Sequence, residues 1–276
     1  MTKNIPGVSF YSMTSLLITN DDGIDAPALV PLAKAMSRLG EVTVAAPNGE
    51  RSWIGKAISK VGTVQADRVE RGGLEMWSID GFPADCVQIG SLGILDTPPD
   101  LVVSGINIGS NKGSAFATGS GTLGAAVEAS NMGLGGIALS AMSVGNWYEW
   151  VDWVHTAEAV EMWTRLADVT ADIVATVLET GIPQEVDVLS VNMPADATLD
   201  TPRQVTTLGR TRYGSLFAGN GGGEYSHSFD GILHTEGDLN GSDLQALDDG
   251  LVSITPIRYA STAPLNDAMR QSWETR

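Results

Sequence analysis

Cysteine and positive charge are scarce in this chain of 276 residues. Its one cysteine, Cys86, lies in an apolar stretch and has no partner for an intramolecular disulfide, so we expect a buried, inert thiol. Lysine and arginine total 16 against 33 acidic residues, and the formal charge is -17. Because no basic run interrupts this charge, the chain repels phosphate-rich polymers and anionic membrane surfaces. We therefore expect no nucleic acid and no membrane among the partners.

Long hydrophobic runs are missing as well. No stretch reaches the roughly 18 apolar residues of a membrane-spanning helix. Residues 1–15 contain one lysine and no long apolar run, which predicts a flexible N-terminal extension and not a signal peptide. The expected location is the cytoplasm.

Histidine is rare, which narrows the chemistry. The three histidines stand at positions 155, 227 and 234, and none follows a predicted strand in the first half of the chain. No Ser-His-Asp triad is indicated, and the nitrogen and sulfur ligands that zinc prefers are lacking. We expect His155 to begin a helix as a structural residue, and His227 and His234 to lie among hairpins.

Glycine and hydrophobic residues are plentiful by contrast. The 32 glycines and a hydrophobic share of 43% indicate a folded globular protein. Through residue 195, short apolar runs alternate with helical stretches, which is the pattern of an α/β fold with a parallel sheet covered by helices. The predicted strands cover 16–19, 42–46, 101–104, 136–140 and 186–191, and the predicted helices cover 28–38, 84–92, 122–132 and 156–179.

The chain changes character after residue 195. Threonine, arginine and glycine become frequent, and 219–223 is nearly a glycine tract, so hairpins are expected from about 203 to 238. A helix near 242–247 and a strand at 251–257 would bring the chain back to the sheet. Region 196–276 is thus predicted as a hairpin region followed by a C-terminal return.

Polar clusters follow three of the predicted strands. They read Asn-Asp-Asp-Gly at 20–23, Pro-Asn-Gly-Glu-Arg-Ser at 47–52 and Ser-Gly-Ile-Asn at 104–107. In an open parallel sheet, ligands bind beyond the carboxyl ends of the strands. We expect the three clusters to meet at one edge of the sheet.

The adjacent carboxylates of Asp21 and Asp22 repel each other. Together with serine and asparagine oxygens they form a donor set suited to a hard cation such as Mg²⁺ or Mn²⁺. Such a cation neutralises the pair, binds a phosphoryl oxygen and activates a water for attack on phosphorus, which predicts metal-assisted phosphoester hydrolysis. The alternative is a plain turn, because Asn, Asp and Gly are also turn formers.

The stretch 104–128 is rich in glycine and suits a phosphate. Glycines let the backbone approach an anion closely, and a helix that begins near Thr122 would point its free N–H groups at that anion. The hydroxyls of Ser120 and Thr122 would add donors.

Other phosphate-handling classes fit less well. Gly119, Gly121 and Gly124 formally match the G-x-G-x-x-G of dinucleotide-binding dehydrogenases, but the match follows a loop and the next strand lacks the ribose-binding acid. The P-loop lysine pattern is absent. Aspartyl-phosphate phosphatases need one residue between their two aspartates, whereas here the two are adjacent. We reject all three classes.

Four tryptophans occur close together, at 147, 150, 153 and 163. Their spacing is close to that of a helical face, which favours core or subunit packing over a base-stacking surface.

Taken in order, these motifs resemble the signature blocks of the stationary-phase survival protein SurE family of 5'-nucleotidases. The resemblance runs from about 16 to 258. The matching blocks are Leu-Ile-Thr-Asn-Asp-Asp-Gly-Ile-Asp-Ala-Pro at 17–27, Ala-Pro-Asn-Gly-Glu-Arg-Ser at 46–52, Val-Ser-Gly-Ile-Asn-Ile-Gly-Ser-Asn at 103–111 and Ser-Gly-Thr-Leu-Gly-Ala-Ala-Val-Glu at 120–128, with later pieces at 189–194, 208–213 and 250–256.

The resemblance implies a Rossmann-like three-layer core at 16–195, with a C-terminal hairpin region that takes part in forming a homodimer or homotetramer. It implies phosphatase activity on nucleoside 5'-monophosphates, and in some members on 3'-nucleotides and short polyphosphate. One divalent metal ion per subunit, Mg²⁺ or Mn²⁺, is implied. Carried over by position, the metal ligands are Asp21, Asp22, Ser52 and Asn107, the phosphate is surrounded by Asn111, Ser120, Gly121 and Thr122, and the catalytic residues are Asp21 and Asp22.

The chain departs from the family pattern at four places, one of which is the loop between Asn111 and Ser120, where the family commonly has an acidic residue and this chain has none. Gly119 stands where the family usually has tyrosine, and Trp53 stands where it usually has a small residue. Trp53 would either crowd the mouth of the site or stack on a base. The segment 146–164, with its tryptophans, has no counterpart that can be placed.

The mechanistic hypothesis is an in-line attack by a water that Asp21 or Asp22 orients while the metal polarises the phosphate. Direct attack on phosphorus by one of the two carboxylates stays open. The alternative function is a nucleotide-binding or scaffolding protein that keeps the fold without turnover.

Overall fold

The computed structural model describes residues 14–229 and 232–275 of the chain. The predicted N-terminal extension therefore lies almost wholly outside the described residues, although Ser15 already belongs to the first strand.

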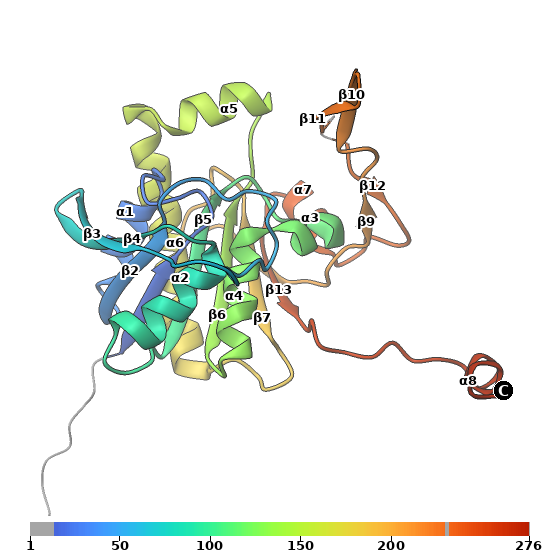
Figure 1. Cartoon of the computed structure of the whole chain (residues 1–276). Helices are drawn as coiled ribbons and strands as arrows, with labels where there is room; N and C mark the ends of the chain where they lie inside the picture. The colour runs from blue at the N-terminus through green and yellow to red at the C-terminus, as the bar shows by residue number, and fades with distance from the viewer. Residues whose placement is uncertain (1–13, 230–231, 276) are drawn as a thin grey trace, which may run out of the picture.

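A nine-stranded sheet forms the centre of the protein, with helices on both faces (Figure 1). Its strand order is β3-β4-β2-β1-β5-β6-β7-β13-β8. The predicted α/β class is confirmed, but the sheet is mixed, since β3 runs antiparallel to β4 and β13 runs antiparallel to β7. The strands are β1 (Ser15–Thr19), β2 (Glu41–Pro47), β3 (Ala66–Arg71), β4 (Leu74–Ile79), β5 (Leu101–Ile108), β6 (Gly135–Ala141), β7 (Val188–Met193), β8 (Arg203–Val205), β9 (Thr211–Arg212), β10 (Phe217–Gly221), β11 (Glu224–His227), β12 (His234–Thr235) and β13 (Val252–Ile257).

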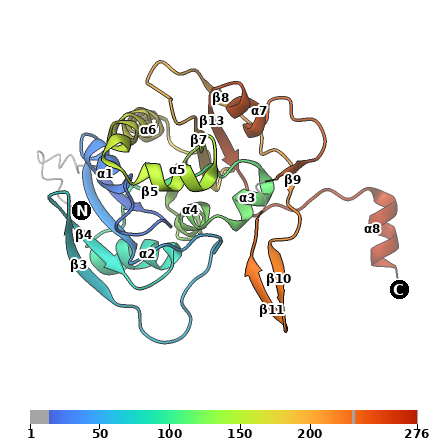
Figure 2. The same ribbon diagram turned by 90° about the horizontal axis from the view of Figure 1, so that it is seen from above.

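Two helical layers cover the sheet. On one face α1 lies against α6, and on the other α2 lies against α4 (Figures 1 and 2). The helices are α1 (Leu29–Met36), α2 (Pro83–Ile89) continued by the π-helix η1 (Gly90–Ile94), α3 (Gly113–Gly119), α4 (Gly121–Asn131), α5 (Trp147–Val154), the short η2 (Ala157–Ala159), α6 (Val160–Thr180), α7 (Asp243–Asp248) and α8 (Asp267–Glu274).

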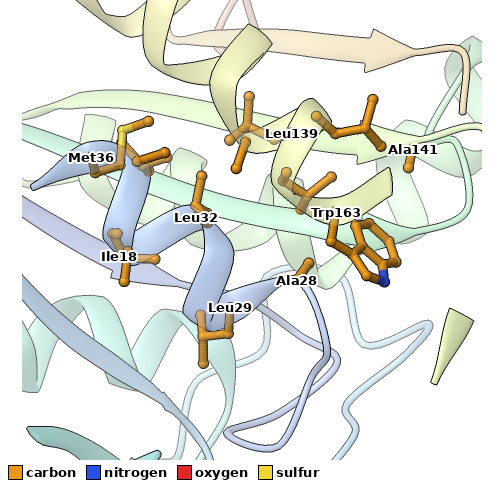
Figure 3. Close-up of a cluster of buried hydrophobic side chains, with 14 of the residues drawn as sticks. Ile18, Ala28, Leu29, Leu32, Met36, Leu139, Ala141 and Trp163 are labelled. Atoms are coloured by element: carbon orange, nitrogen blue, oxygen red, sulfur yellow. The ribbon is translucent and has the colours of Figure 1, made fainter. Parts of the chain in front are cut away.

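The central strand β1 is covered by helices on both faces, which explains its continuous apolar sequence. Leu16, Leu17 and Ile18 are all fully buried, because a strand covered on both faces has no solvent side. Leu16 and Ile18 belong to the cluster under α1 and α6, and Leu17 belongs to the cluster under α2 and α4. Figure 3 shows side chains of α1, α6 and the sheet gathered in the first of these clusters.

Region 203–238 contains the predicted hairpins only in part. Strands β10 and β11 pair antiparallel, and so do β9 and β12. The expectation of a hairpin at 203–205 was wrong, since β8 pairs in parallel with β13. Strand β13 pairs with β7 on one side only, so its other edge can form backbone hydrogen bonds with the short extended segment β8.

Five elements were not predicted: the strands β3 and β4, which form a hairpin, and the helices α3, α5 and α8. Strand β3 lies at the edge of the sheet and is largely exposed, so its sequence carries no apolar run. Helix α5 did carry a local signal, since the side chain of Asn146 caps it by accepting the N–H groups of Tyr148 at 2.9 Å and Glu149 at 3.3 Å.

His155 does not begin a helix, and that expectation was wrong. It follows the last residue of α5, where its Nδ1 lies 2.8 Å from the carbonyl oxygen of Val151. The ring therefore occupies the C-terminal end of a short helix, where carbonyls lack helical partners. His227 and His234 lie in β11 and β12, as predicted.

The four clustered tryptophans divide into two pairs. Trp150 and Trp163 are buried in the core, whereas Trp147 and Trp153 are 48% and 36% exposed. Core packing is therefore confirmed for two of the four, and subunit packing of the other two stays a prediction. Cys86 is buried as expected, and burial raises the pKa of its thiol. Among the described helices, none is long and apolar enough to cross a membrane.

Candidate active site

Three strand ends meet at one edge of the sheet, as predicted. Strand β1 lies between β2 and β5 and runs parallel to both, with Thr19 in register with Ser104. Two hydrogen bonds join the segments that follow: the N–H of Arg51 donates to the carbonyl of Asp21 at 2.7 Å, and the N–H of Ile108 donates to Oδ2 of Asp22 at 3.1 Å.

The segment 20–23 is a tight turn and part of the candidate site at once. The side chain of Asn20 donates to the carbonyl of Gly23 and accepts its N–H, at 2.9 and 3.1 Å. Gly23 has a φ of +96°, and a Cβ there would lie 2.8 Å from the carbonyl carbon of Gly49. Glycine is needed because this backbone passes close to the segment after β2.

Asp21 is held at the start of α4. It is 3% exposed, and its Oδ1 accepts the hydroxyl hydrogen of Thr122 at 2.6 Å. A Cβ on Gly121 would lie 2.8 Å from the Cβ of Asp21, closer than side chains approach. The first residues of α4 and the end of β1 are therefore in direct contact. Asp22 is only partly buried.

The negative charges of the two carboxylates are not compensated by neighbouring positive charges among the described residues. Burial raises the pKa of Asp21 to about 6, although hydrogen bonds from Thr122 oppose the shift. Burial and then the charge of Asp21 raise the pKa of Asp22 well above its usual range. The charge of Glu50 adds to both shifts. In the described part of the chain, neither aspartate forms an ion pair with a basic side chain.

The other two predicted ligands come from the neighbouring strand ends. Ser52 is exposed, and its hydroxyl donates to Oε1 of Glu50 at 2.6 Å. The side-chain amide nitrogen of Asn107 donates to the carbonyl of Gly109 at 2.6 Å, which leaves its Oδ1 as the atom to bind a cation. No group of three or more His, Cys, Asp or Glu side chains able to hold a metal occurs among the residues described. The donor set is therefore two carboxylates with neutral oxygens, which fits a hard divalent cation.

The predicted phosphate residues surround the start of α4, but several already have protein partners. Ser120 is the N-cap of α4, and its Oγ accepts the N–H of Leu123 at 3.1 Å. Asn111 is buried, and its side chain donates to Oγ of Ser140 at 2.8 Å. With the Thr122 hydroxyl donated to Asp21, the candidate donors to an anion are the Ser120 hydroxyl and the N–H of Gly121 at the start of α4. Their role toward phosphate stays a prediction.

The comparisons with known proteins agree with this architecture. Residues 16–215 match the family described as Survival protein SurE. This chain belongs to the SurE family. A protein named 5'-nucleotidase SurE from Methanocella arvoryzae is 35% identical over 252 residues, covering 90% of this chain and 93% of that protein. Another with the same name, from Geotalea daltonii, is 36% identical over 267 residues, covering 94% and 98%.

A solved structure supports the same assignment. The crystal structure of the SurE protein from Aquifex aeolicus superposes with a TM-score of 0.70 at 29% identity, covering 94% of this chain and 98% of that one. The family resemblance found in the sequence is confirmed. The SurE-like fold is confirmed with it.

Three further residues that bond to or act on this SurE site were not singled out from the sequence. Asn192, at the end of β7, accepts the N–H of Asn111 at 2.8 Å. Asp243 is fully buried and accepts the N–H groups of Gly113 and Gly209, at 2.7 and 2.8 Å. Glu50 lies close enough to Asp21 and Asp22 to raise their pKa values. Glu50 had a local signal in its place in the polar cluster after β2, and Asn192 lies in the family-like stretch 189–194, whereas nothing local marked Asp243.

Proposed function

We propose that this protein is a metal-dependent phosphatase that hydrolyses nucleoside 5'-monophosphates to a nucleoside and phosphate. Membership of the SurE family, with relatives named 5'-nucleotidase over 90% or more of the chain, supports a 5'-nucleotidase. The observation that carries the proposal is the meeting, at one sheet edge, of the N-terminus of α4 with two carboxylates that have no basic partner among the described residues.

In this proposal Asp21, Asp22, Ser52 and Asn107 hold one divalent cation per subunit, Mg²⁺ or Mn²⁺. A cation bound there would neutralise the two aspartates and draw electron density from the phosphate ester. The oxygen-only donor set supports this choice of metal over zinc. Glu50 helps by holding the Ser52 hydroxyl at 2.6 Å.

The protein's own residues orient the reaction. Asp21 is fixed by Thr122 and buried, whereas Asp22 is partly accessible and held on one oxygen by Ile108. We assign Asp22 to orient the attacking water and accept its proton. The water oxygen then bonds to phosphorus as the bond from phosphorus to the 5' oxygen breaks; the leaving nucleoside oxygen takes a proton from solvent water, and Asp22 releases its proton to solvent.

The substrate phosphate in this scheme lies at the start of α4. The N–H of Gly121 and the hydroxyl of Ser120 donate to it, and the helix dipole adds to the attraction. Asn111 and Thr122 keep these donors in place through their bonds to Ser140 and Asp21. The proposal also includes 3'-nucleotides and short polyphosphate as secondary substrates, a homodimer or homotetramer built with region 196–276, and a cytoplasmic location.

A phosphate-release assay tests the proposal. The full chain is given a panel of nucleoside monophosphates with Mg²⁺, with Mn²⁺, and with a chelator in excess. We expect release that depends on the cation and stops with the chelator. A protein that binds nucleotides but releases no phosphate under any of these conditions would be the non-catalytic scaffold instead.

A further inference from the structure

Four aromatic rings gather around Trp53, the residue that follows the proposed ligand Ser52, and the five rings together form one group. The ring of Trp53 lies 5.7 Å from Phe116 and from Tyr213, 5.6 Å from His227 and 5.9 Å from Phe229, measured between ring centroids. These rings come from the loop after β2, from α3, from the segment after β9, from β11 and from the segment that follows it. We call them the aromatic cluster.

The aromatic cluster adjoins the catalytic edge through Trp53. A Cβ on Gly119, which directly precedes the helix cap Ser120, would lie 3.4 Å from the indole ring of Trp53. The N–H of Gly55 donates to the carbonyl of Gly119 at 2.9 Å, so the whole loop lies along the start of α4. The ring thus occupies the space next to Gly119, beside the proposed phosphate donors.

The backbone of Trp53 has an unfavourable conformation for a residue with a large side chain. It is the only non-glycine residue with a positive φ in the described chain, at +57°, a conformation that a bulky side chain rarely adopts. Its side chain is nevertheless 41% exposed. A strained backbone that presents a large ring to solvent points to a ligand, since strain of this kind collects at functional sites.

The charges near the site give an independent reason. Lys56 pairs with Glu128, Arg51 lies 3.7 Å from Asp80, and Lys112 lies 3.6 Å from Asp248. These cations are already matched by carboxylates, in a chain with a formal charge of -17. Uncharged contacts are therefore a further source of binding strength for a nucleotide beside the metal, and stacking on a ring supplies one.

We propose that the aromatic cluster is the nucleobase site of this enzyme, with Trp53 as the ring on which the base stacks. The inference rests on the proposed function, because it places the base of the same substrate. It makes Trp53 a specificity-determining residue that distinguishes a nucleotide from a sugar phosphate.

The kinetic test compares adenosine 5'-monophosphate with ribose 5-phosphate, which has the same phosphate and sugar without the base. In Trp53→Asn the ring is lost, while asparagine tolerates the left-handed backbone better than most residues. We expect KM for the nucleotide to rise about tenfold, in line with the loss of one stacked ring. The kcat for the nucleotide and the kinetics with ribose 5-phosphate should stay unchanged, and Trp53→Phe should recover part of the loss.

The binding test uses adenosine alone and needs no turnover. Adenosine should quench the tryptophan fluorescence of the wild type in a saturable way. The quench should disappear in Trp53→Asn and persist in Trp273→Leu, a matched loss of an indole that is 70% exposed on the distant α8. If the wild type hydrolyses no phosphate ester but shows this quench, the proposed function fails while the base site stands.

Three results would overturn the proposal. Equal losses on both substrates in Trp53→Asn would mean that the ring only holds the Ser52 loop. An unchanged KM with the quench retained would remove the base from this cluster. A rise in KM in Trp147→Asn and not in Trp53→Asn would place the base on Trp147, whose ring lies 3.0 Å from where a Cβ on Gly109 would be.

Discussion

The hydroxyl of Thr122 donates to Oδ1 of Asp21 at 2.6 Å, a bond between residues 101 positions apart. It joins the end of the central strand to the first turn of α4. The proposed metal side and the proposed phosphate side of the site are therefore linked through one buried contact. This link makes the geometry of the site sensitive to substitutions that touch neither ligand directly.

Asp22→Asn should abolish nucleotide hydrolysis. The amide keeps the shape and can still accept the N–H of Ile108, but it carries no charge for a cation and cannot take a proton. Loss of a direct ligand should cost more than the roughly 10–100-fold that is lost when a residue hydrogen-bonded to a ligand is replaced. Phosphate release at saturating Mg²⁺ or Mn²⁺ measures it, with an unchanged melting temperature as the check on folding. Near-normal turnover would remove Asp22 from the mechanism.

Thr122→Val should weaken both stability and metal binding. Valine has the shape of threonine without the hydroxyl, so buried Asp21 loses a hydrogen bond worth about 1.5–3 kcal/mol to a charged group. Urea unfolding should show this loss, and the metal concentration for half-maximal activity should rise about 10–100-fold. Thr122→Ser keeps the hydroxyl and is the matched control. Equal behaviour of the valine and serine variants would contradict the role given to this bond.

Gly121→Ala should impair the site by pushing Asp21 aside. The new methyl group would lie 2.8 Å from Cβ and 2.9 Å from Oδ2 of Asp21, both well inside normal contact. Metal affinity and kcat should both fall. Gly93→Ala adds the same methyl group 3.8 Å from Ile89, an ordinary contact, and should leave both quantities unchanged. The idea fails if the two variants have the same metal affinity.

The contribution of Glu128 to the stability of the protein should decrease at acid pH. Burial raises the pKa of Glu128, but hydrogen bonds from Lys56, Gln88 and Asn131 outweigh it, so the pKa lies below its usual value of 4.5. A depressed acid pKa contributes stability above the unfolded value, and this stability is lost as the pH falls through the folded value. Urea unfolding of wild type and Glu128→Gln should differ at neutral pH, and the difference should shrink as the pH falls below the usual value of 4.5.

The control for this pH effect is Glu75→Gln. Glu75 pairs with Arg68 on the exposed β3–β4 hairpin, where both side chains are more than half exposed, so its loss should change stability by less than about 1 kcal/mol. A constant difference between wild type and Glu128→Gln across the whole pH range would show that the pair contributes by packing and not by charge.

Local sequence patterns were enough to predict the elements whose structure depends on residues close together in the chain. The run 16–19 is apolar because β1 is covered on both faces, and the polar residues after it had to emerge at the sheet edge. Ser120 is an N-cap residue, so the start of α4 could be predicted within one position. Parallel pairing then brought Asp22 and Asn107 to the same edge.

The tertiary structure alone decided which of these polar groups face one another. Strand β3 and helix α3 have weak local signals. Strand β3 pairs with β4 at the edge of the sheet, and α3 packs against β9 and α4. The Thr122 bond to Asp21, the brace at Asp243 and the gathering of rings around Trp53 join segments far apart in the chain. Such contacts depend on the packing of the whole chain, which no local spacing of residues encodes. The types of functional side chain could therefore be predicted from the sequence, whereas their contact partners follow only from the tertiary structure.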